Sequence, residues 1–387
     1  MKKLFSIINR KKGIRSFYQL VSLICTYPLY LFGLLVPKQS NIWIFGNIFG
    51  YRDNACYLFE YVRTHHPEIT PVWIYRLSDS LPKNGSACYA CYSVKGLYYQ
   101  YRAKIAFAST GKGDFARFSL AKTNIIQLWH GIPVKRILLD SKELIPFSGE
   151  KSWFNDIAYK ILRNSLSQYS VIIASSTKVQ ARLASAFGVP KSKIAITGYP
   201  RHDIIMEHAM EMKRRILYAP TWRKDIKNAL AIVRMICNVD FVNCLRESGF
   251  DLWISIHPLN ASITHVLQNE LGDTVNFIES NDINIELARC EVLITDYSSI
   301  AVDFSLLGRK IVFFAPDIDE YKMTTGLYSE FENIISENVA NTIETIYQIL
   351  KNNDDKSYSV QDETYFHYRD SGARKRIVDL VKTKFCQ

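Results

Sequence analysis

The sequence predicts an α/β protein with one parallel sheet in each half of the chain. Short apolar runs alternate with longer amphipathic segments from residue 42 to residue 314, which is typical of strands that are each followed by a covering helix. The series restarts near residue 215, and a chain of 387 residues suits two cores of ordinary size. Polar residues follow several of the apolar runs, at the edge where open parallel sheets bind their ligands.

The first half of the chain contains apolar runs that we expect to form strands at 42–45, 71–75, 105–108, 124–128, 171–174 and 194–197. Helical candidates lie between these runs at 55–63, 94–101 and 178–187. Because strands alternate with helices, we expect this half to form a parallel sheet with helices on both faces.

The second half repeats the pattern. Strands are expected at 215–220, 252–257, 275–278, 292–295 and 311–314, and helices at 229–248, 283–289 and 301–307. Two such halves predict two Rossmann-like domains that face a cleft, with a hinge near 200–213. The expected domains are 38–205 and 206–387, and they follow an N-terminal segment, 1–37.

The N-terminal segment combines positive charge with an apolar stretch. Its basic residues are Lys2, Lys3, Arg10, Lys11, Lys12 and Arg15. The stretch 17–36 that follows is about as long as one bilayer crossing, but it contains Pro28 and several tyrosines that suit a membrane interface. We therefore expect a monotopic anchor on the cytoplasmic face of the membrane. The alternative is an ordinary buried pair of helices.

The composition indicates a globular protein with an anionic partner. Hydrophobic residues make up 48% of the chain and charged residues 22%, and the net charge is +11. Positive charge favours a nucleotide, a phosphopolymer or an anionic membrane. Nucleic acid is not expected, because zinc-finger spacing, aromatic RNA-binding motifs and a basic recognition helix are absent from the sequence. Eight scattered cysteines, with one isolated Cys-x-x-Cys at Cys88 and Cys91, predict reduced thiols.

The most informative motif is Thr-Asp-Tyr-Ser-Ser at 295–299, directly after the apolar run 292–294. Ser298 or Ser299 can cap the helix that follows. Hydroxyls beside the free amides of a helix start form a cradle for a phosphate group. The alternative is a serine-capped helix with no ligand.

Two further motifs follow strands in the first half. Trp-His-Gly-Ile-Pro-Val-Lys at 129–135 places His130 in a loop beside Gly131, where a backbone can approach a ligand closely. Gly-Tyr-Pro-Arg-His-Asp at 198–203 offers Arg201, whose guanidinium can bind two phosphate oxygens. The alternative for Arg201 is a place in a solvated linker.

Two more motifs follow strands in the second half. Tyr-Ala-Pro-Thr-Trp-Arg at 218–223 provides Thr221, with a hydroxyl and an amide, after Pro220. His257 precedes Pro258, which forces an extended backbone at the histidine and fixes the direction of its imidazole.

Taken in this order, the motifs resemble those of the CDP-glycerol glycerophosphotransferase family, which includes the enzymes that prime and polymerise teichoic acids. That family carries Trp-His-Gly-Thr-Pro-Leu-Lys, Gly-x-Pro-Arg, Tyr-Ala-Pro-Thr-x-Arg, His-Pro and Thr-Asp-Tyr-Ser-Ser-x-x-x-Asp, the last ending here at Asp303. The resemblance covers residues 42–328. Ile132 stands where the family usually has Thr, and Val134 replaces Leu. Ser255 stands where polymerising members often carry Arg.

The resemblance implies a two-domain fold of the glycosyltransferase-B type. It also implies transfer of glycerol phosphate from CDP-glycerol to a hydroxyl of a lipid-linked saccharide or polyol-phosphate acceptor, with release of CMP. It implies His130 as the base and His257 as a phosphate contact that offsets charge on the leaving group, but the sequence leaves open which of these two catalytic histidines is the base. Asp303 is expected to orient the polyol or the serine pair. The substrate-binding residues implied are Gly131, Ile132, Pro133, Val134, Arg201, Pro220, Thr221, Ser298, Ser299 and Asp303.

Several points stay open from the sequence. The resemblance implies no resident cofactor or metal, and a divalent metal requirement, the choice of glycerol or ribitol donor and the acceptor are undecided. The alternative functions are a nucleotide-sugar glycosyltransferase of the same fold and a non-catalytic relative that binds a surface polymer.

Overall fold

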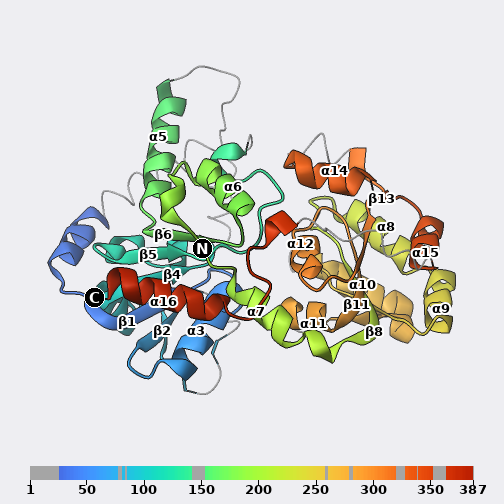
Figure 1. The fold of residues 1–387 in the computed structure, drawn as a ribbon, viewed down its shortest axis with the longest axis horizontal. Helices are drawn as coiled ribbons and strands as arrows, with labels where there is room; N and C mark the ends of the chain where they lie inside the picture. Colours follow the sequence, from blue (N-terminus) through green and yellow to red (C-terminus); the bar gives the residue numbers. More distant parts are fainter. Residues whose placement is uncertain are drawn as a thin grey trace. The chain divides into compact units, whose positions relative to one another are not determined.

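The computed structural model describes residues 26–76, 81–82, 85–141, 153–257, 260–278, 282–319, 327–337, 339–351 and 363–386. The chain divides into two compact units (Figure 1). One unit is Met1–Trp129 together with Val378–Gln387, and the other is His130–Ile377. The predicted α/β class with two parallel sheets is confirmed.

The first sheet has seven strands in the order β3-β2-β1-β4-β5-β6-β7. The strands are β1 (Gln39–Gly46), β2 (Thr70–Tyr75), β3 (Cys88–Ala90), β4 (Ala103–Ala108), β5 (Asn124–Gln127), β6 (Val171–Ala174) and β7 (Ile194–Ile196). β1 pairs in parallel with β2 on one side and with β4 on the other, so that Ile44 lies opposite both Val72 and Ala106. The continuous apolar runs of these strands fit a sheet that is covered on both faces.

The helices that accompany these strands are α3 (Asp53–His65), α4 (Val94–Arg102), α5 (Trp153–Ser167) and α6 (Thr177–Phe187). Capping residues fix their ends. Ser93 caps α4 by accepting from the amide of Gly96, and Ser176 caps α6 by accepting from the amide of Val179. α6 ends at Gly188, whose φ of 62° is the left-handed conformation that favours glycine.

The predicted membrane segment, 17–36, falls partly outside the described residues. Its described part forms the helix Thr26–Leu35. The Tyr101 hydroxyl of α4 donates to the carbonyl of Leu29 at 3.0 Å, and the Tyr101 ring meets Phe32 edge-on. A Cβ at Gly33 would lie 3.0 Å from the Tyr101 ring, so this glycine permits the close approach of the helix to α4.

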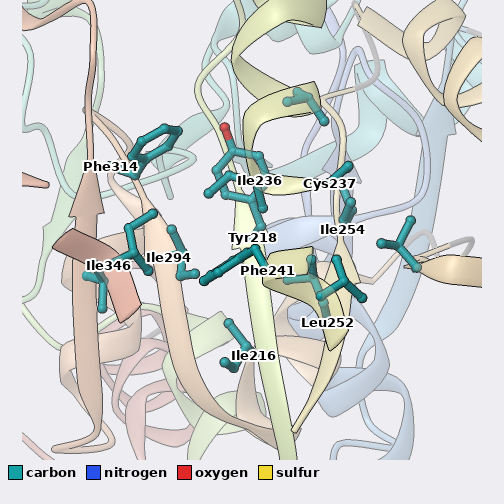
Figure 2. Packing of buried hydrophobic residues seen from close by; sticks show 14 of the residues in the cluster. Ile216, Tyr218, Ile236, Cys237, Phe241, Leu252, Ile254, Ile294, Phe314 and Ile346 are labelled. Carbon is teal, nitrogen blue, oxygen red and sulfur yellow. The ribbon is translucent and has the colours of Figure 1, made fainter. Parts of the chain in front are cut away.

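The second sheet has six strands in the order β10-β9-β8-β11-β12-β13. The strands are β8 (Lys213–Ala219), β9 (Asp251–Ile254), β10 (Asn276–Phe277), β11 (Cys290–Thr295), β12 (Lys310–Phe314) and β13 (Val339–Ala340). The helices around it are α8 (Ile226–Ile236), α9 (Val239–Glu247), α10 (Ala261–Leu271), α11 (Ile283–Arg289), α12 (Ile300–Ser305), α14 (Ser329–Glu337) and α15 (Ile343–Lys351). Figure 2 shows the apolar core in which side chains of β8, β9, β11 and β12 meet those of α8, α9 and α15.

The predicted single helix 229–248 is wrong, because two helices occupy this stretch. The side chain of Asn238 accepts from the amide of Phe241 at 3.1 Å and starts α9. The stretch Ile226–Glu247 is apolar and long enough to cross a membrane. However, Ile232, Ile236 and Phe241 are buried in the core of the second sheet, so these helices pack as core helices.

The stretch 200–213, where the sequence predicts a hinge, begins with helical structure. This stretch contains α7 (Pro200–Glu207), with the proline at its first turn, followed by the 3-10 turn Ala209–Glu211. A proline at this position costs no hydrogen bond, because the first amides of a helix have no partner within it. Arg201, His202 and Asp203 are all buried, so the motif at 198–203 is not a solvated linker.

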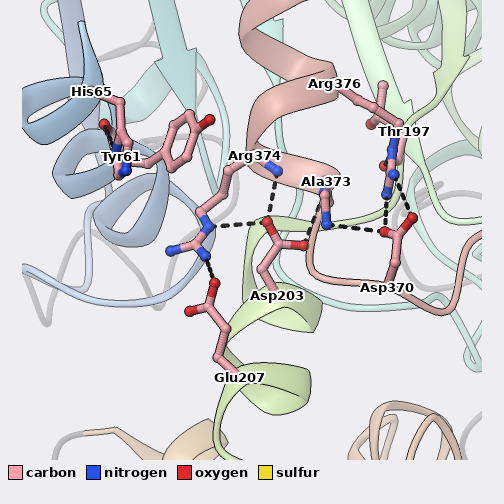
Figure 3. A network of polar contacts seen from close by, with 10 residues as sticks. Tyr61, His65, Thr197, Asp203, Glu207, Asp370, Ala373, Arg374 and Arg376 are labelled. Atoms are coloured by element: carbon pink, nitrogen blue, oxygen red, sulfur yellow. Dashed lines mark hydrogen bonds and ion pairs between the residues drawn. The ribbon is translucent and has the colours of Figure 1, made fainter.

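A carboxylate of α7 caps a helix that lies far away in the sequence (Figure 3). Asp203 accepts from the amides of Ala373 and Arg374, both at 2.8 Å, and from Nε of Arg374 at 3.0 Å. These amides start α16 (Ala373–Phe385). Glu207 of α7 pairs with the same guanidinium. The α16 start is therefore fixed by a buried negative charge.

We expect Asp203→Ala to lower the free energy of unfolding by about 3 kcal/mol, because it leaves a buried amide pair and a guanidinium without their acceptor. Glu207→Ala is the matched control. It removes a half-exposed partner of the same arginine and should cost less than about 1 kcal/mol. Chemical denaturation of the two variants checks this, and equal shifts of the two midpoints would contradict the assigned role of Asp203.

Candidate functional site

A strained turn precedes the loop that carries His130. Trp129 is buried, with a φ of 56°, which is costly for a bulky side chain. Asn54 Nδ2 donates to the Trp129 carbonyl at 2.8 Å, and the Gln127 side chain accepts from the Trp129 amide at 3.1 Å. In the loop itself, residues 130–135, His130 is exposed and the next four residues are buried.

A buried arginine of α7 bonds to this loop. Arg201 Nη1 donates to the carbonyl of His130 at 2.9 Å, and its Nη2 lies 3.2 Å from Asp303 Oδ2. The other oxygen of Asp303 lies 3.2 Å from His202 Nε2. Arg201, Asp303 and His202 are only 6%, 3% and 2% exposed. The side chain of Asp303 of α12 thus contacts both Arg201 and His202.

Gly131 lies close to Arg201 and to Ser299. A Cβ at this position would be 3.0 Å from Arg201 Nη2 and 3.2 Å from Ser299 Oγ, so a larger residue would displace one of them. The expected serine cap is only partly present. Ser299 stands at the N-cap of α12 without a side-chain cap bond, and Ser298 Oγ accepts from the Ile300 amide at a long 3.4 Å.

A second group of polar residues lies where β8 and β11 end side by side. Asp296 accepts from the Thr221 amide at 2.9 Å and from Arg223 Nη1 at 2.8 Å. Arg223 also forms a two-pronged pair with Asp317, at 2.8 and 2.9 Å. Burial disfavours the charge of Arg223, but its bonds to Asp317 and the field of Asp296 raise its pKa above the usual range. The buried Thr221 Oγ1 has no hydrogen-bond partner among the described residues.

A small pocket adjoins this group and includes His257. Its lining consists of Pro220, Thr221, Arg223, Ala229, Val233, Ile256, His257, Asn260 and Ile263. Burial lowers the pKa of His257, and the positive charge of Lys135 lowers it further. Burial likewise lowers the pKa of Lys135, against the attraction of Asp296. Lys135, at the end of the loop 130–135, is therefore close enough to His257 and Asp296 for their charges to affect one another. Pro258 lies outside the described residues.

The expected site residues thus form two groups. One brings together His130, Gly131, Arg201, Ser299 and Asp303, and the other contains Pro220, Thr221 and His257. Ile132, Pro133 and Val134 are buried in the loop. The carbonyl groups of Pro133 and Val134 accept hydrogen bonds from Arg182 and from the Tyr328 amide. Ser298 contacts the start of α12.

Sequence reasoning missed several members of these groups. His202 stands beside Arg201 in its motif, so that motif could have indicated it. Asp317 and Asn260, which bonds to both the amide and the carbonyl of Arg223, carry no comparable signal. In the described part of the chain, no group of three or more His, Cys, Asp and Glu residues could hold a metal ion. The hydroxyls, amides and guanidinium groups of the two groups are chemically suited to an anion.

Comparison with known proteins points to one family. Teichoic acid poly(glycerol phosphate) polymerase of Staphylococcus epidermidis is 26% identical over 354 residues, which are 84% of this chain and 46% of that protein. The Bacillus subtilis polymerase of the same name is 27% identical, over 84% of this chain and 45% of its own length. The chain spans about half the length of these two relatives. The teichoic acid glycerol-phosphate transferase of Staphylococcus aureus is 24% identical, over 89% and 93% of the two chains.

The fold agrees with a solved structure. The wall teichoic acid polymerase TagF superposes with a TM-score of 0.76 over 96% of this chain and 97% of that chain, at 21% identity. The family model described as CDP-Glycerol:Poly(glycerophosphate) glycerophosphotransferase matches residues 29–383. The resemblance predicted from the motifs is confirmed, and the chain belongs to the CDP-glycerol:poly(glycerophosphate) glycerophosphotransferase family.

Proposed function

We propose that this protein transfers glycerol phosphate from CDP-glycerol to a hydroxyl group of a lipid-linked or polymeric acceptor in the synthesis of teichoic acid or a related surface polymer. Membership of the family and the names of its relatives support this. The observation that carries it is the convergence of His130, Gly131, Arg201, Ser299 and Asp303, which come from three separate motifs.

In the proposed reaction, the acceptor hydroxyl attacks the β-phosphorus of CDP-glycerol. A new P–O bond forms to the acceptor, the bond between that phosphorus and the oxygen shared with CMP breaks, and CMP leaves with this oxygen. His130 accepts the proton of the attacking hydroxyl. Its exposed position on the loop suits a base that must reach a second substrate.

The donor contacts are assigned to the second half of the chain, 206–387, with Arg201 added from the first half, and the acceptor contacts are assigned to 38–205. Thr221, with Pro220 beside it, Ser298, Ser299 and Arg201 would bind the pyrophosphate. The unsatisfied, buried hydroxyl of Thr221 supports this, since such a group gains by meeting a polar ligand. Burial and Lys135 lower the pKa of His257, which favours the neutral ring, and this ring would contact a phosphate as an N–H donor.

We further propose that the protein lies on the cytoplasmic face of the membrane as a monotopic protein. The helix Thr26–Leu35 is apolar, and most of it is exposed, with Phe32 56% and Leu35 82% accessible. An apolar helix that the described part of the protein leaves largely exposed suits the interface of a bilayer. The basic residues that precede it in the sequence suit anionic headgroups.

The function is tested by incubating the protein with CDP-glycerol and lipid-linked saccharides and measuring CMP release and product size. Thermal shifts with CDP-glycerol, CDP-ribitol and UDP-sugars identify the donor, because a ligand of the folded state raises the melting temperature. Stabilisation by a UDP-sugar alone would support a glycosyltransferase instead.

We expect His130→Ala to lower kcat for CMP release by roughly 10²–10⁴-fold, the usual contribution of a general base. The melting temperature should stay close to that of the unmodified protein, because this side chain is exposed. His265→Ala, at an exposed position of α10, is the control. Release of CMP to an acceptor at a near-normal rate by the His130 variant would overturn the assignment.

We expect Gly131→Ala to lower kcat/KM by about tenfold, because its Cβ would press on Arg201 Nη2 and Ser299 Oγ at a cost of about 1–2 kcal/mol. Gly113→Ala is the matched control, since the nearest atom that its Cβ would meet is an arginine nitrogen 3.8 Å away. Steady-state kinetics of both variants decide the matter. Equal kcat/KM values for the two variants would show that the reaction does not need the close approach of Gly131 to Arg201 and Ser299.

We expect Lys135→Met to raise the pKa of His257, because it removes a positive charge that disfavours the protonated ring. The shift should be partial, since burial is the larger cause of the lowered pKa and remains. An NMR titration of the His257 ring protons checks this, with Lys351→Met at the end of α15 as control. An unchanged or lower titration midpoint would mean that Lys135 does not act on this ring.

A further inference from the structure

A second buried arginine bonds to the same loop from another element. Arg182 of α6 donates from Nη1 to the carbonyl of Pro133 at 3.0 Å, just as Arg201 of α7 donates to the carbonyl of His130. Arg182 is 6% exposed and belongs to none of the motifs described above. The loop is thus held at both ends of the stretch 130–133 by charged donors.

The surroundings of Arg182 keep its guanidinium in one position. Nη2 lies 3.0 Å from Glu330 Oε2, and both terminal nitrogens lie 3.3 Å from the Tyr365 hydroxyl. The guanidinium carbon lies 4.6 Å from the centre of the Tyr328 ring and 5.2 Å from that of Tyr365. Aromatic faces and a carboxylate stabilise a buried guanidinium in a way that a lysine could not reproduce.

The segment that carries Glu330 also follows the loop. The Tyr328 amide donates to the Val134 carbonyl at 3.0 Å, and Lys135 forms an antiparallel bridge with Leu327. The Tyr328 hydroxyl donates to Asp140 at 2.7 Å. Arg182 therefore joins the loop, at Pro133, to the segment that pairs with the next two residues of the loop.

We propose that Arg182 is a positioning residue that holds the loop 130–135 in its working conformation and so places His130 and Lys135. The proposal rests on the proposed function for its effect on the reaction, but not for its effect on the loop. The loop has no helix of its own, and its carbonyl groups are its points of attachment. A displacement of about 1 Å at a catalytic group costs as much as about 10²-fold in rate.

The test compares Arg182→Met and Arg182→Lys with Lys178→Met. Lys178 lies one turn earlier on α6 and over the same Tyr365 ring, at 4.8 Å, so its loss removes a neighbouring positive charge but leaves the Arg182–Pro133 bond intact. Amide hydrogen exchange of peptides covering 130–136 reports on the loop without any substrate. The kcat and the KM for CDP-glycerol, per folded molecule, report on the reaction.

We expect Arg182→Met to speed exchange in 130–136 by about tenfold and to lower kcat by about tenfold or more. The KM for CDP-glycerol should change by less than about threefold, because Thr221 and His257 are held by other elements. Arg182→Lys should give values between those of Arg182→Met and the unmodified protein, since one ammonium group cannot bond to Pro133 and Glu330 at the same time. Lys178→Met should match the unmodified protein in both measurements.

Normal loop exchange in a folded Arg182→Met variant, or faster exchange with normal kcat, would overturn the proposal. If Arg182→Met does not fold, Tyr365→Phe and Glu330→Gln remove its partners singly. Both should speed exchange by about threefold, and an unchanged loop in both would also overturn it. Absence of CMP release from the unmodified protein would refute the proposed function, while the exchange data would still decide the role of Arg182 in the loop.

Discussion

The candidate site depends on how one irregular loop is held. Residues 130–135 contain no helix, and within the described residues one isolated β-bridge, from Lys135 to Leu327, joins them to another segment. Their position is set by carbonyl groups that accept from buried or partly buried donors: Arg201 at His130, Arg182 at Pro133 and the Tyr328 amide at Val134. Charged donors form stronger hydrogen bonds than neutral ones, so the loop is fixed by a few strong bonds. Because the loop is held rigidly, the exposed side chain of His130 can keep a fixed direction.

Each of the two arginines is paired with a carboxylate, and this pairing explains why they can stay buried. Arg201 faces Asp303, which also contacts His202, and Arg182 faces Glu330. An unpaired guanidinium in these positions would cost several kcal/mol. Asp303 therefore connects α12 to Arg201 and His202 of α7.

The sequence predicted the strands well, because a buried parallel strand is a continuous apolar run such as 42–45 or 292–295. It also indicated most residues of the candidate site, since they follow those strands in short motifs. It could not show partners that come from distant segments. Asp317, Arg182 and the Asp203 cap of α16 depend on tertiary contacts that no local pattern reveals. Helix α7 was not among the predicted helices, although Pro200 suits the first turn of a helix.

The replacement of the family's usual Thr by Ile132 can be understood from the tertiary contacts of the loop. Where the family usually has Thr, this chain has an aliphatic side chain that is 1% exposed. Its neighbours on both sides in the sequence are buried as well, and Pro133 bonds through its carbonyl to Arg182. A side chain so enclosed contributes by packing the loop against the protein. Exchange of the threonine hydroxyl for an aliphatic group at this point then alters the interior of the loop, while the exposed His130 and the close approach of Gly131 to Arg201 and Ser299 remain. At this departure from the family pattern, the buried side chain packs the loop against the protein.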